Sequence, residues 1–87
     1  MKKVIVYGSP MCPHCVEAKE ILEKEGIRYG YVDITAGMAH LKKFLELRDS
    51  RPEFDKAKEV GDIGIPCFLV DDKDLYVMLP ENLDVFR

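Results

Sequence analysis

The sequence predicts an α/β domain built on one mixed four-stranded sheet with helices on its faces. Two observations lead to this fold class. A strand–helix–strand unit near the N-terminus implies parallel pairing through a right-handed crossover. Two strand-like runs near the C-terminus, joined by a short turn, imply an antiparallel hairpin. One sheet accommodates both kinds of pairing, so residues 1–87 are expected to form a single domain.

The first half of the sheet is expected around one helix. An unbroken apolar run at Lys3–Tyr7, rich in β-branched residues, suits a strand that is buried on both faces. A Gly-Ser-Pro sequence ends this strand. A helical pattern follows over Pro13–Glu25, with its apolar residues on one side, and Gly26 is a natural stop. The next strand is expected within Ile27–Ile34.

The middle of the chain is expected to hold two consecutive helices. Thr35 is the candidate N-cap of the first, which ends near Asp49. Ser50 and Glu53 have the spacing of a capping box and begin a second, shorter helix that ends at Gly61. The apolar residues of both helices are expected to face the core: Met38, Leu41, Phe44, Leu45, Phe54, Ala57 and Val60.

The last part of the chain completes the sheet. A third strand is expected at Cys67–Val70, a turn at Asp71–Lys73 and a fourth strand at Leu75–Leu79. The remaining sequence, PENLDVFR, leaves room for only about two helical turns. A shortened C-terminal helix is therefore expected to follow the hairpin.

Composition excludes several classes of protein. The net charge is only −3, and charged residues of both signs make up 33% of the chain, which gives no electrostatic footprint for nucleic acid. The longest apolar runs are about five residues, too short to span a membrane. Three cysteines are too few for a secreted disulfide framework. We therefore expect a cytoplasmic, monomeric protein whose thiols are mostly reduced.

The sequence CPHC contains the residues with the clearest chemistry. Cys12 lies where the loop after the first strand enters the first helix, and Pro13 fits the first helical position because its missing N–H costs nothing there. Cys12 is then the N-cap, so the unpaired N–H groups and the helix dipole favour its thiolate, as does a protonated His14. Pro13 and His14 are thus expected to tune its reactivity. Cys15, one turn further on and partly covered, can resolve a mixed disulfide on Cys12.

These residues resemble the glutaredoxin branch of the thioredoxin superfamily. CPHC after a short strand looks like the family's CPxC site, and GIPCFLV, with Ile65 and Pro66 before a later strand, looks like its cis-proline segment. The pattern YxxVDI at Tyr29–Ile34 also fits, and the resemblance covers most of the chain. It implies a thioredoxin-like, glutaredoxin-like fold with a cis peptide before Pro66, close to the two cysteines. Ile65 would offer backbone hydrogen bonds to an extended substrate.

The resemblance also implies an enzyme, a glutaredoxin-like thiol–disulfide oxidoreductase. Cys12 is then the nucleophile toward protein disulfides or glutathione mixed disulfides, and Cys15 is the resolving thiol. A thiol reductant or a reductase would restore the dithiol. The substrate site is expected at the neighbours of the motif and of the later proline: Met11, Gly64, Ile65 and Pro66.

The chain departs from the glutaredoxin pattern in three places. Leu47–Asp62 is an extra segment that adds a short helix before Pro66. Ser9 stands where glutaredoxins commonly carry a basic residue, and MLPENLD lacks the Gly-Gly turn that leads into their γ-glutamyl site. Glutathione is therefore expected only as a weak co-substrate. Arg48 or Arg51 is an alternative anchor for a substrate carboxylate.

Other roles for the cysteines stay open. A zinc site usually takes four ligands from two separated pairs, and beyond CPHC only Cys67 and His40 remain, so no bound metal or other cofactor is expected. Cys67 is expected to pack as a small buried side chain, with a third reactive thiol as the alternative. The alternative function is a non-catalytic redox sensor or metal-binding module that uses Cys12, Cys15 and Cys67.

Overall fold

The computed structural model describes residues 2–87, and a four-stranded sheet lies at its centre. The strands are β1 (Val4–Gly8), β2 (Gly30–Asp33), β3 (Cys67–Val70) and β4 (Asp74–Val77). Their order across the sheet is β2–β1–β3–β4. β1 pairs in parallel with β2 and antiparallel with β3, and β3 forms a hairpin with β4. The predicted mixed sheet is confirmed, although β2 and β4 are shorter than expected.

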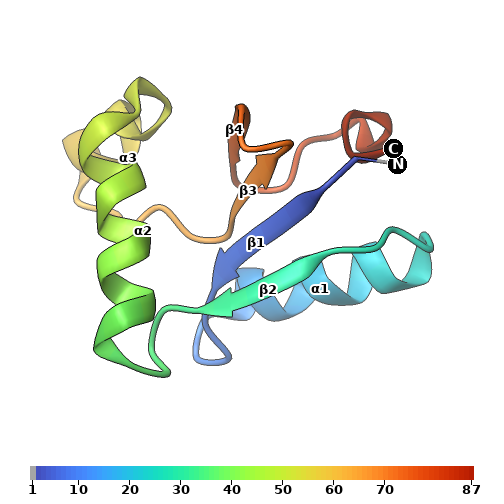
Figure 1. Cartoon of the computed structure of the whole chain (residues 1–87), viewed down its shortest axis with the longest axis horizontal. Coiled ribbons are helices and arrows are strands. Elements are labelled where there is room, and N and C mark those ends of the chain that lie inside the picture. The colour runs from blue at the N-terminus through green and yellow to red at the C-terminus, as the bar shows by residue number, and fades with distance from the viewer. Residues whose placement is uncertain (1) are drawn as a thin grey trace.

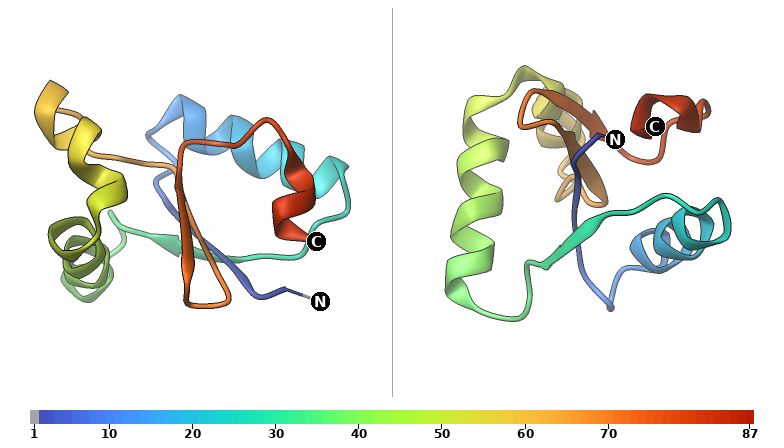
Figure 2. Two further views of the ribbon diagram at one scale, coloured as in Figure 1. Left: turned by 90° about the horizontal axis from the view of Figure 1, so that it is seen from above. Right: turned by 45° about the vertical axis from the view of Figure 1, so that its right-hand side comes forward.

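The helical segments cover both faces of this sheet. They are α1 (Pro13–Lys24), α2 (Met38–Ser50), the 3-10 turn η1 (Pro52–Phe54), α3 (Asp55–Val60) and the 3-10 turn η2 (Leu83–Phe86). Figure 1 shows α2 and α3 at one end of the view and α1 along β2. In the turned views α2 and α3 lie on one side of the sheet, and α1 and η2 lie on the other (Figure 2). The sheet is thus the middle of three layers. None of the helices within residues 2–87 combines the length and apolar character needed to cross a membrane.

Two apolar clusters hold these layers together. The cluster under α1 contains Val4, Val6, Ala18, Leu22, Ile27, Phe68, Val70 and Phe86. The cluster under α2 and η1 contains Tyr7, Ile34, Phe44, Phe54, Cys67, Leu69 and Leu75. Side chains of a strand alternate between its two faces, so the central strands β1 and β3 contribute to both clusters. Every residue of β3 is buried, as expected for a strand covered on both faces.

The prediction that Thr35 caps the helix now defined as α2 is wrong. α2 begins at Met38 after Gly37, and no side chain caps it. Thr35 lies in the turn after β2, where its backbone N–H donates to the Asp33 carboxylate at 2.8 Å. Its hydroxyl also shares a hydrogen bond with the Ser9 hydroxyl at 3.1 Å. The aspartate two residues earlier therefore engages Thr35 in a local turn instead of a helix start.

The capping box predicted at Ser50 and Glu53 does not form either. Ser50 is still part of α2, and its hydroxyl donates to the carbonyl of Glu46 at 2.7 Å. The Glu53 carboxylate pairs instead with Arg51 at 3.1 Å. The predicted stop is correct, because Gly61 ends α3 with a left-handed φ of 79°.

Three residues predicted to face the core are exposed: Met38, Leu45 and Val60. Their exposed fractions are 80%, 39% and 62%. α2 buries Phe44 and α3 buries Ala57, so each helix packs against the rest of the protein by a narrow stripe. The flanks of α2 are therefore left uncovered.

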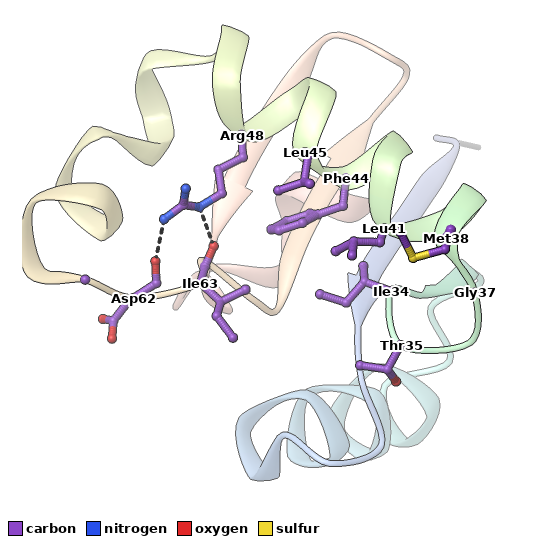
Figure 3. A pocket seen from close by; sticks show the side chains of 11 residues that line it. Ile34, Thr35, Gly37, Met38, Leu41, Phe44, Leu45, Arg48, Asp62 and Ile63 are labelled. Atoms are coloured by element: carbon purple, nitrogen blue, oxygen red, sulfur yellow. Dashed lines mark hydrogen bonds between the residues drawn. The ribbon is translucent and has the colours of Figure 1, made fainter.

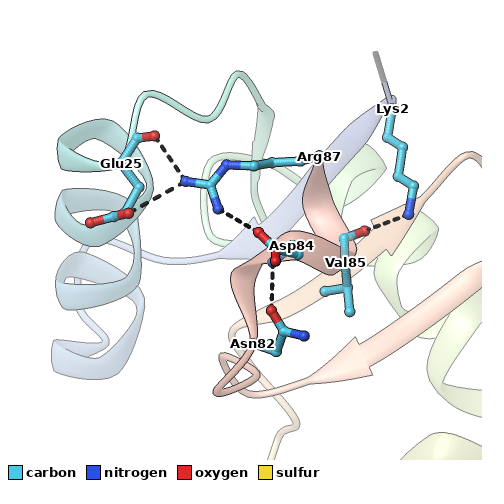
Figure 4. Close-up of polar contacts among 6 residues, drawn as sticks. All are labelled: Lys2, Glu25, Asn82, Asp84, Val85 and Arg87. Carbon is cyan, nitrogen blue, oxygen red and sulfur yellow. Dashed lines mark hydrogen bonds and ion pairs between the residues drawn. The ribbon is translucent and has the colours of Figure 1, made fainter.

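The chain ends in a single 3-10 turn, not in the two helical turns expected from PENLDVFR. Phe86 is buried against Phe68, with ring centroids 5.2 Å apart. Figure 4 shows Arg87 between the Glu25 carboxylate at the end of α1, at 3.3 Å, and the Asp84 carboxylate, at 3.1 Å. Exposed ion pairs contribute little to stability, so the buried phenyl ring is the main anchor of this segment.

Gly64 is expected to be essential for the connection between α3 and β3. It is buried, its φ is 98°, and an added Cβ would lie 2.8 Å from the Phe54 ring. Gly64→Ala should lower the free energy of unfolding by about 2–4 kcal/mol, because overpacking adds to the penalty of a left-handed residue. Denaturant titration measures this loss.

Gly61→Ala is the matched control for that substitution. Gly61 has a φ of 79°, but nothing lies within 4 Å of an added Cβ. Gly61→Ala is expected to lower the free energy of unfolding by about 1 kcal/mol, because only the penalty of a left-handed residue applies. Equal losses for the two variants would contradict the close packing of Gly64 on Phe54.

Candidate active site

Cys12 is the N-cap of α1, as the proline after it predicts. Its backbone is extended, with φ −103° and ψ 112°, and Pro13 opens the helix. The Cys12 sulfur accepts a hydrogen bond from the backbone N–H of Cys15 at 3.3 Å. The same N–H also donates to the Cys12 carbonyl at 3.0 Å, so the sulfur shares one of the donors of the helix start. The hydrogen bond to the sulfur also holds it at the positive end of the helix dipole, which favours negative charge there.

The second cysteine of the motif lies below the surface. Cys15 has no exposed area, whereas Cys12 is half-buried. Burial raises the pKa of the Cys15 thiol to about 12, and its hydrogen bond with Cys12 adds to the shift. Gly8 of β1 makes room for this sulfur, since an added Cβ there would lie 3.0 Å from it. The two cysteines therefore differ in access although they are one helical turn apart.

Tyr31 is a neighbour of Cys15 that sequence patterns do not single out. Its hydroxyl and the Cys15 sulfur each lie 3.0 Å from the position that a Cβ on Gly8 would take, so they are at most twice that distance apart. Burial raises the pKa of Tyr31 to about 12, and the charge of Cys15 adds to this. The Lys19 ammonium lies 4.2 Å from the ring centroid. The register of β2 on β1, which pairs Tyr31 with Val6, is what places it there.

The segment before β3, residues 64–66, lies close to the CPHC motif. The peptide between Ile65 and Pro66 is cis. Pro66 is fully buried, and its carbonyl accepts a hydrogen bond from the backbone N–H of Met78 at 2.8 Å. This bond ties the segment to the residue that follows β4. Pro66 borders a small hollow together with His14 and Met78.

A cleft of about 580 Å³ opens beside Cys12. Most of the residues predicted for the site line it: Met11, Cys12, His14, Gly64 and Ile65. Pro66 borders the adjacent hollow, and Cys15 and Cys67 lie beneath the surface. The structure thus brings the CPHC motif and the Gly-Ile-Pro segment together around one opening.

The cleft contains few ionisable side chains besides the Cys12 thiol. Its ionisable side chains are Cys12, His14 and Asp62, and no Lys or Arg of residues 2–87 lines it. Ser9, where a basic residue is common in glutaredoxins, is buried and accepts a hydrogen bond from the Met11 N–H at 3.1 Å. The cleft therefore offers no fixed cation to a carboxylate.

The two arginines considered as alternative anchors are engaged within the protein. Arg48 donates to the backbone carbonyls of Asp62 and Ile63, at 2.8 and 2.9 Å. Arg51 pairs with Glu53 and donates to the carbonyl of Lys73 at 2.6 Å. Both guanidinium groups thus brace the extra segment.

Cys67 packs as a buried side chain, as expected. It begins β3 opposite Tyr7 and has no exposed area. Burial raises the pKa of its thiol to about 12, with a smaller effect from the charge of Cys15. Across residues 2–87, no three His, Cys, Asp or Glu side chains are arranged to hold a metal ion. The three sulfurs therefore do not form a ligand set in this arrangement.

A mixed sheet with a dithiol at the start of α1 and a cis-proline before β3 defines a protein of the thioredoxin-fold class. The glutaredoxin family model matches residues 4–73. The chain is 30% identical over 95 residues to glutaredoxin 1 of Salmonella typhimurium, a match that covers 94% of this chain and 95% of that protein. It is 34% identical over 86 residues to an uncharacterized protein of Haemophilus influenzae, with 99% and 100% covered.

A solved structure agrees with these matches. The crystal structure of the glutaredoxin from Methanosarcina mazei Go1 aligns with a TM-score of 0.66 and 25% identity, over 91% of this chain and 70% of that one. The chain belongs to the glutaredoxin family. Membership supports thiol–disulfide oxidoreductase activity in general.

Burial of Cys67 is expected to make stability depend on alkaline pH. Its pKa rises from an ordinary value of 9.0 to about 12, so the folded protein keeps a proton that the unfolded chain releases above about pH 9. Raising the pH from there favours unfolding by about 1.4 kcal/mol per pH unit, and this dependence vanishes below about pH 8. Cys67→Ala should remove that slope.

Urea unfolding of the unmodified protein and of Cys67→Ala between pH 7 and 11, under reducing conditions, measures how the free energy of unfolding of each depends on pH. Cys15 and the tyrosines titrate in both proteins, so only the smaller electrostatic coupling of Cys67 to Tyr7 and Cys15 differs besides the Cys67 thiol itself. Parallel pH profiles for the two proteins would contradict the neutral, buried state of Cys67.

Proposed function

We propose that this protein is a dithiol oxidoreductase of protein disulfides, with Cys12 as the nucleophile and Cys15 as the resolving thiol. The observation that carries this proposal is the difference in access between the two sulfurs. Cys12 lines the cleft at the start of α1, and Cys15 is closed off beneath it. An incoming disulfide therefore meets Cys12 first.

The reaction consists of two thiol–disulfide exchanges. The Cys12 thiolate attacks one sulfur of the substrate disulfide, the S–S bond breaks, and the other sulfur leaves as a thiolate that takes up a proton. Cys15 then loses its proton and attacks the Cys12 sulfur, which releases the second substrate thiol. The substrate gains two electrons, and the protein ends with a Cys12–Cys15 disulfide. An external thiol reductant or a reductase returns the two electrons.

The surroundings of each sulfur suit its step. The helix start favours negative charge on Cys12, which the first attack needs. Cys15, with a pKa of about 12, stays protonated at neutral pH and does not compete for the incoming disulfide. It becomes a nucleophile only when it can pass its proton on, and its hydrogen-bond partners are the Cys12 side chain and the Ser9 backbone, with the Tyr31 hydroxyl also nearby.

The substrate is inferred to bind in an extended form. Gly64 and Ile65 line the cleft opposite the motif. β3 begins at Cys67, two residues after Ile65. Backbone hydrogen bonds to this segment would align a peptide across Cys12 with little dependence on its sequence.

The metal-binding alternative has less support. The ligands that it requires are not grouped within residues 2–87, and Cys67 is fully buried in the sheet. Metal content of the purified protein distinguishes the two functions. Stoichiometric zinc that is lost on Cys67→Ser would favour the metal module.

Single cysteine variants are expected to separate the two exchange steps. Cys12→Ser should abolish reduction of insulin by dithiothreitol above the uncatalysed rate. Cys15→Ser should accumulate a mixed disulfide on Cys12, since no internal thiol releases the substrate. Mass spectrometry of the acid-quenched reaction measures the adduct. Full turnover by Cys12→Ser would refute its assignment as the nucleophile.

Glutathione is expected to be a poor substrate partner. A flexible, charged tripeptide needs anchors at its ends, and the cleft has no cation for its carboxylates. We expect kcat/KM for a glutathionylated peptide to be no higher than for the same peptide linked to a neutral cysteine peptide. Asp62→Lys supplies a cation in the cleft. It should raise kcat/KM for the glutathionylated peptide by about tenfold and leave kcat/KM for the neutral peptide disulfide unchanged.

One result would contradict the expected weak use of glutathione. A strong preference of the unmodified protein for the glutathionylated peptide, lost on Arg48→Ala or Arg51→Ala, would show that the extra segment binds glutathione. Asp62→Asn is the control that removes the acidic charge without adding a cation.

A further inference from the structure

A second hollow lies next to the Cys12 cleft. It has a volume of about 750 Å³ and is formed by α2, the turn after β2 and the loop after α3. Figure 3 shows Leu41, Phe44 and Ile63 converging on it from α2 and from that loop. Its walls are almost entirely apolar. We call this hollow the α2 groove.

The α2 groove and the Cys12 cleft share a wall. Residues 61–63 line both hollows, one on each side of the loop. Arg48 fixes this loop to α2 through hydrogen bonds from its guanidinium group to the carbonyls of Asp62 and Ile63, at 2.8 and 2.9 Å (Figure 3). The groove is therefore a continuation of the cleft across a braced loop, and not a separate face of the molecule.

The side chains around the α2 groove are unusually exposed for their type. Met38 is 80% exposed, Ile63 59% and Leu45 39%. Exposed apolar residues that gather in one place on a small protein mark a binding surface. Arg48 and Asp62 are the charged residues of the lining, and the guanidinium group of Arg48 is bound to carbonyls. A charged ligand would find few groups to pair with in this lining. An apolar side chain would be stabilised there, because its surface is removed from water.

We propose that the α2 groove binds an apolar side chain of the protein substrate whose disulfide Cys12 attacks. The inference rests on the proposed function, because the occupant reaches the groove from the cleft. An extended chain advances about 3.3 Å per residue. A peptide that crosses the shared loop therefore presents to the groove a side chain that is a few residues from the reacting cysteine. The groove thus selects polypeptides over small thiols.

Peptide disulfides that carry one movable leucine test this proposal. Each peptide has one cysteine, linked to 2-mercaptoethanol, in an alanine- and serine-rich sequence. The leucine is placed two to six residues from the cysteine on either side, and a leucine-free peptide is the reference. We expect leucine at one or two of these positions to raise kcat/KM by about tenfold to one hundredfold. Equal kcat/KM values for all peptides would overturn the proposal.

Substitutions in the groove provide the second part of the test. Met38→Lys and Leu45→Lys change exposed side chains and should abolish the gain from leucine without slowing the leucine-free peptide. Ala39→Lys adds the same charge to an exposed position of α2 that does not line the groove, and should keep the gain. Loss of the gain in all three variants would overturn the assignment to the groove.

Two further measurements distinguish failure of the proposed function from failure of the groove assignment. Hydroxyethyl disulfide, which cannot reach the groove, reports on Cys12 alone. If the protein reduces neither this disulfide nor any of the peptide disulfides, the proposed function fails and this inference fails with it. If hydroxyethyl disulfide is reduced normally but the protein forms a dimer that Leu45→Lys dissociates, as sedimentation would show, the groove binds a second copy and the substrate assignment is overturned.

Discussion

The hydrogen bond from the Cys15 backbone N–H to the Cys12 sulfur is the contact on which the site depends. It requires an extended residue directly before the helix, which Cys12 provides, and Pro13 suits the first helical position because its φ is already helical. With Cys12 fixed at the helix end, the helical period places Cys15 one turn further on and facing inward. Packing of α1 on β1 then closes the second sulfur off from water. The cap and the packing of α1 together determine which sulfur is open and which is covered.

The strand order explains why the later segment meets the motif. β1 pairs antiparallel with β3, and Tyr7 near the end of β1 lies opposite Cys67 at the start of β3. The loop that leaves β1 and the loop that enters β3 therefore emerge at the same edge of the sheet. Cys12 follows the first loop, and Ile65 and Pro66 end the second. The cleft is a consequence of this topology, and the extra segment before it supplies the braced loop that separates the cleft from the α2 groove.

Local signals predicted the features that depend on neighbouring residues. The Cys12 N-cap, the stop at Gly61 and the bounds of β3 are examples. Thr35 and Ser50 were predicted wrongly because each has a competing partner, Asp33 and the Glu46 carbonyl, within four residues. The remaining features depend on pairing or packing across the chain. The position of Tyr31 follows from the β1–β2 register, and the exposure of Met38 and Leu45 follows from the way α2 rests on the sheet. Helical periodicity alone does not contain this information.

The central claim is that the fold exposes one sulfur and buries two. Site-resolved alkylation tests it most directly, with the reduced protein treated briefly with iodoacetamide at pH 8 and each cysteine then quantified by mass spectrometry. The expected result is modification of Cys12 alone in the folded protein, because Cys15 and Cys67 have no exposed area and thiols whose pKa is about 12. All three should react in urea. Modification of Cys15 or Cys67 in the folded protein at a rate comparable to that of Cys12 would contradict it.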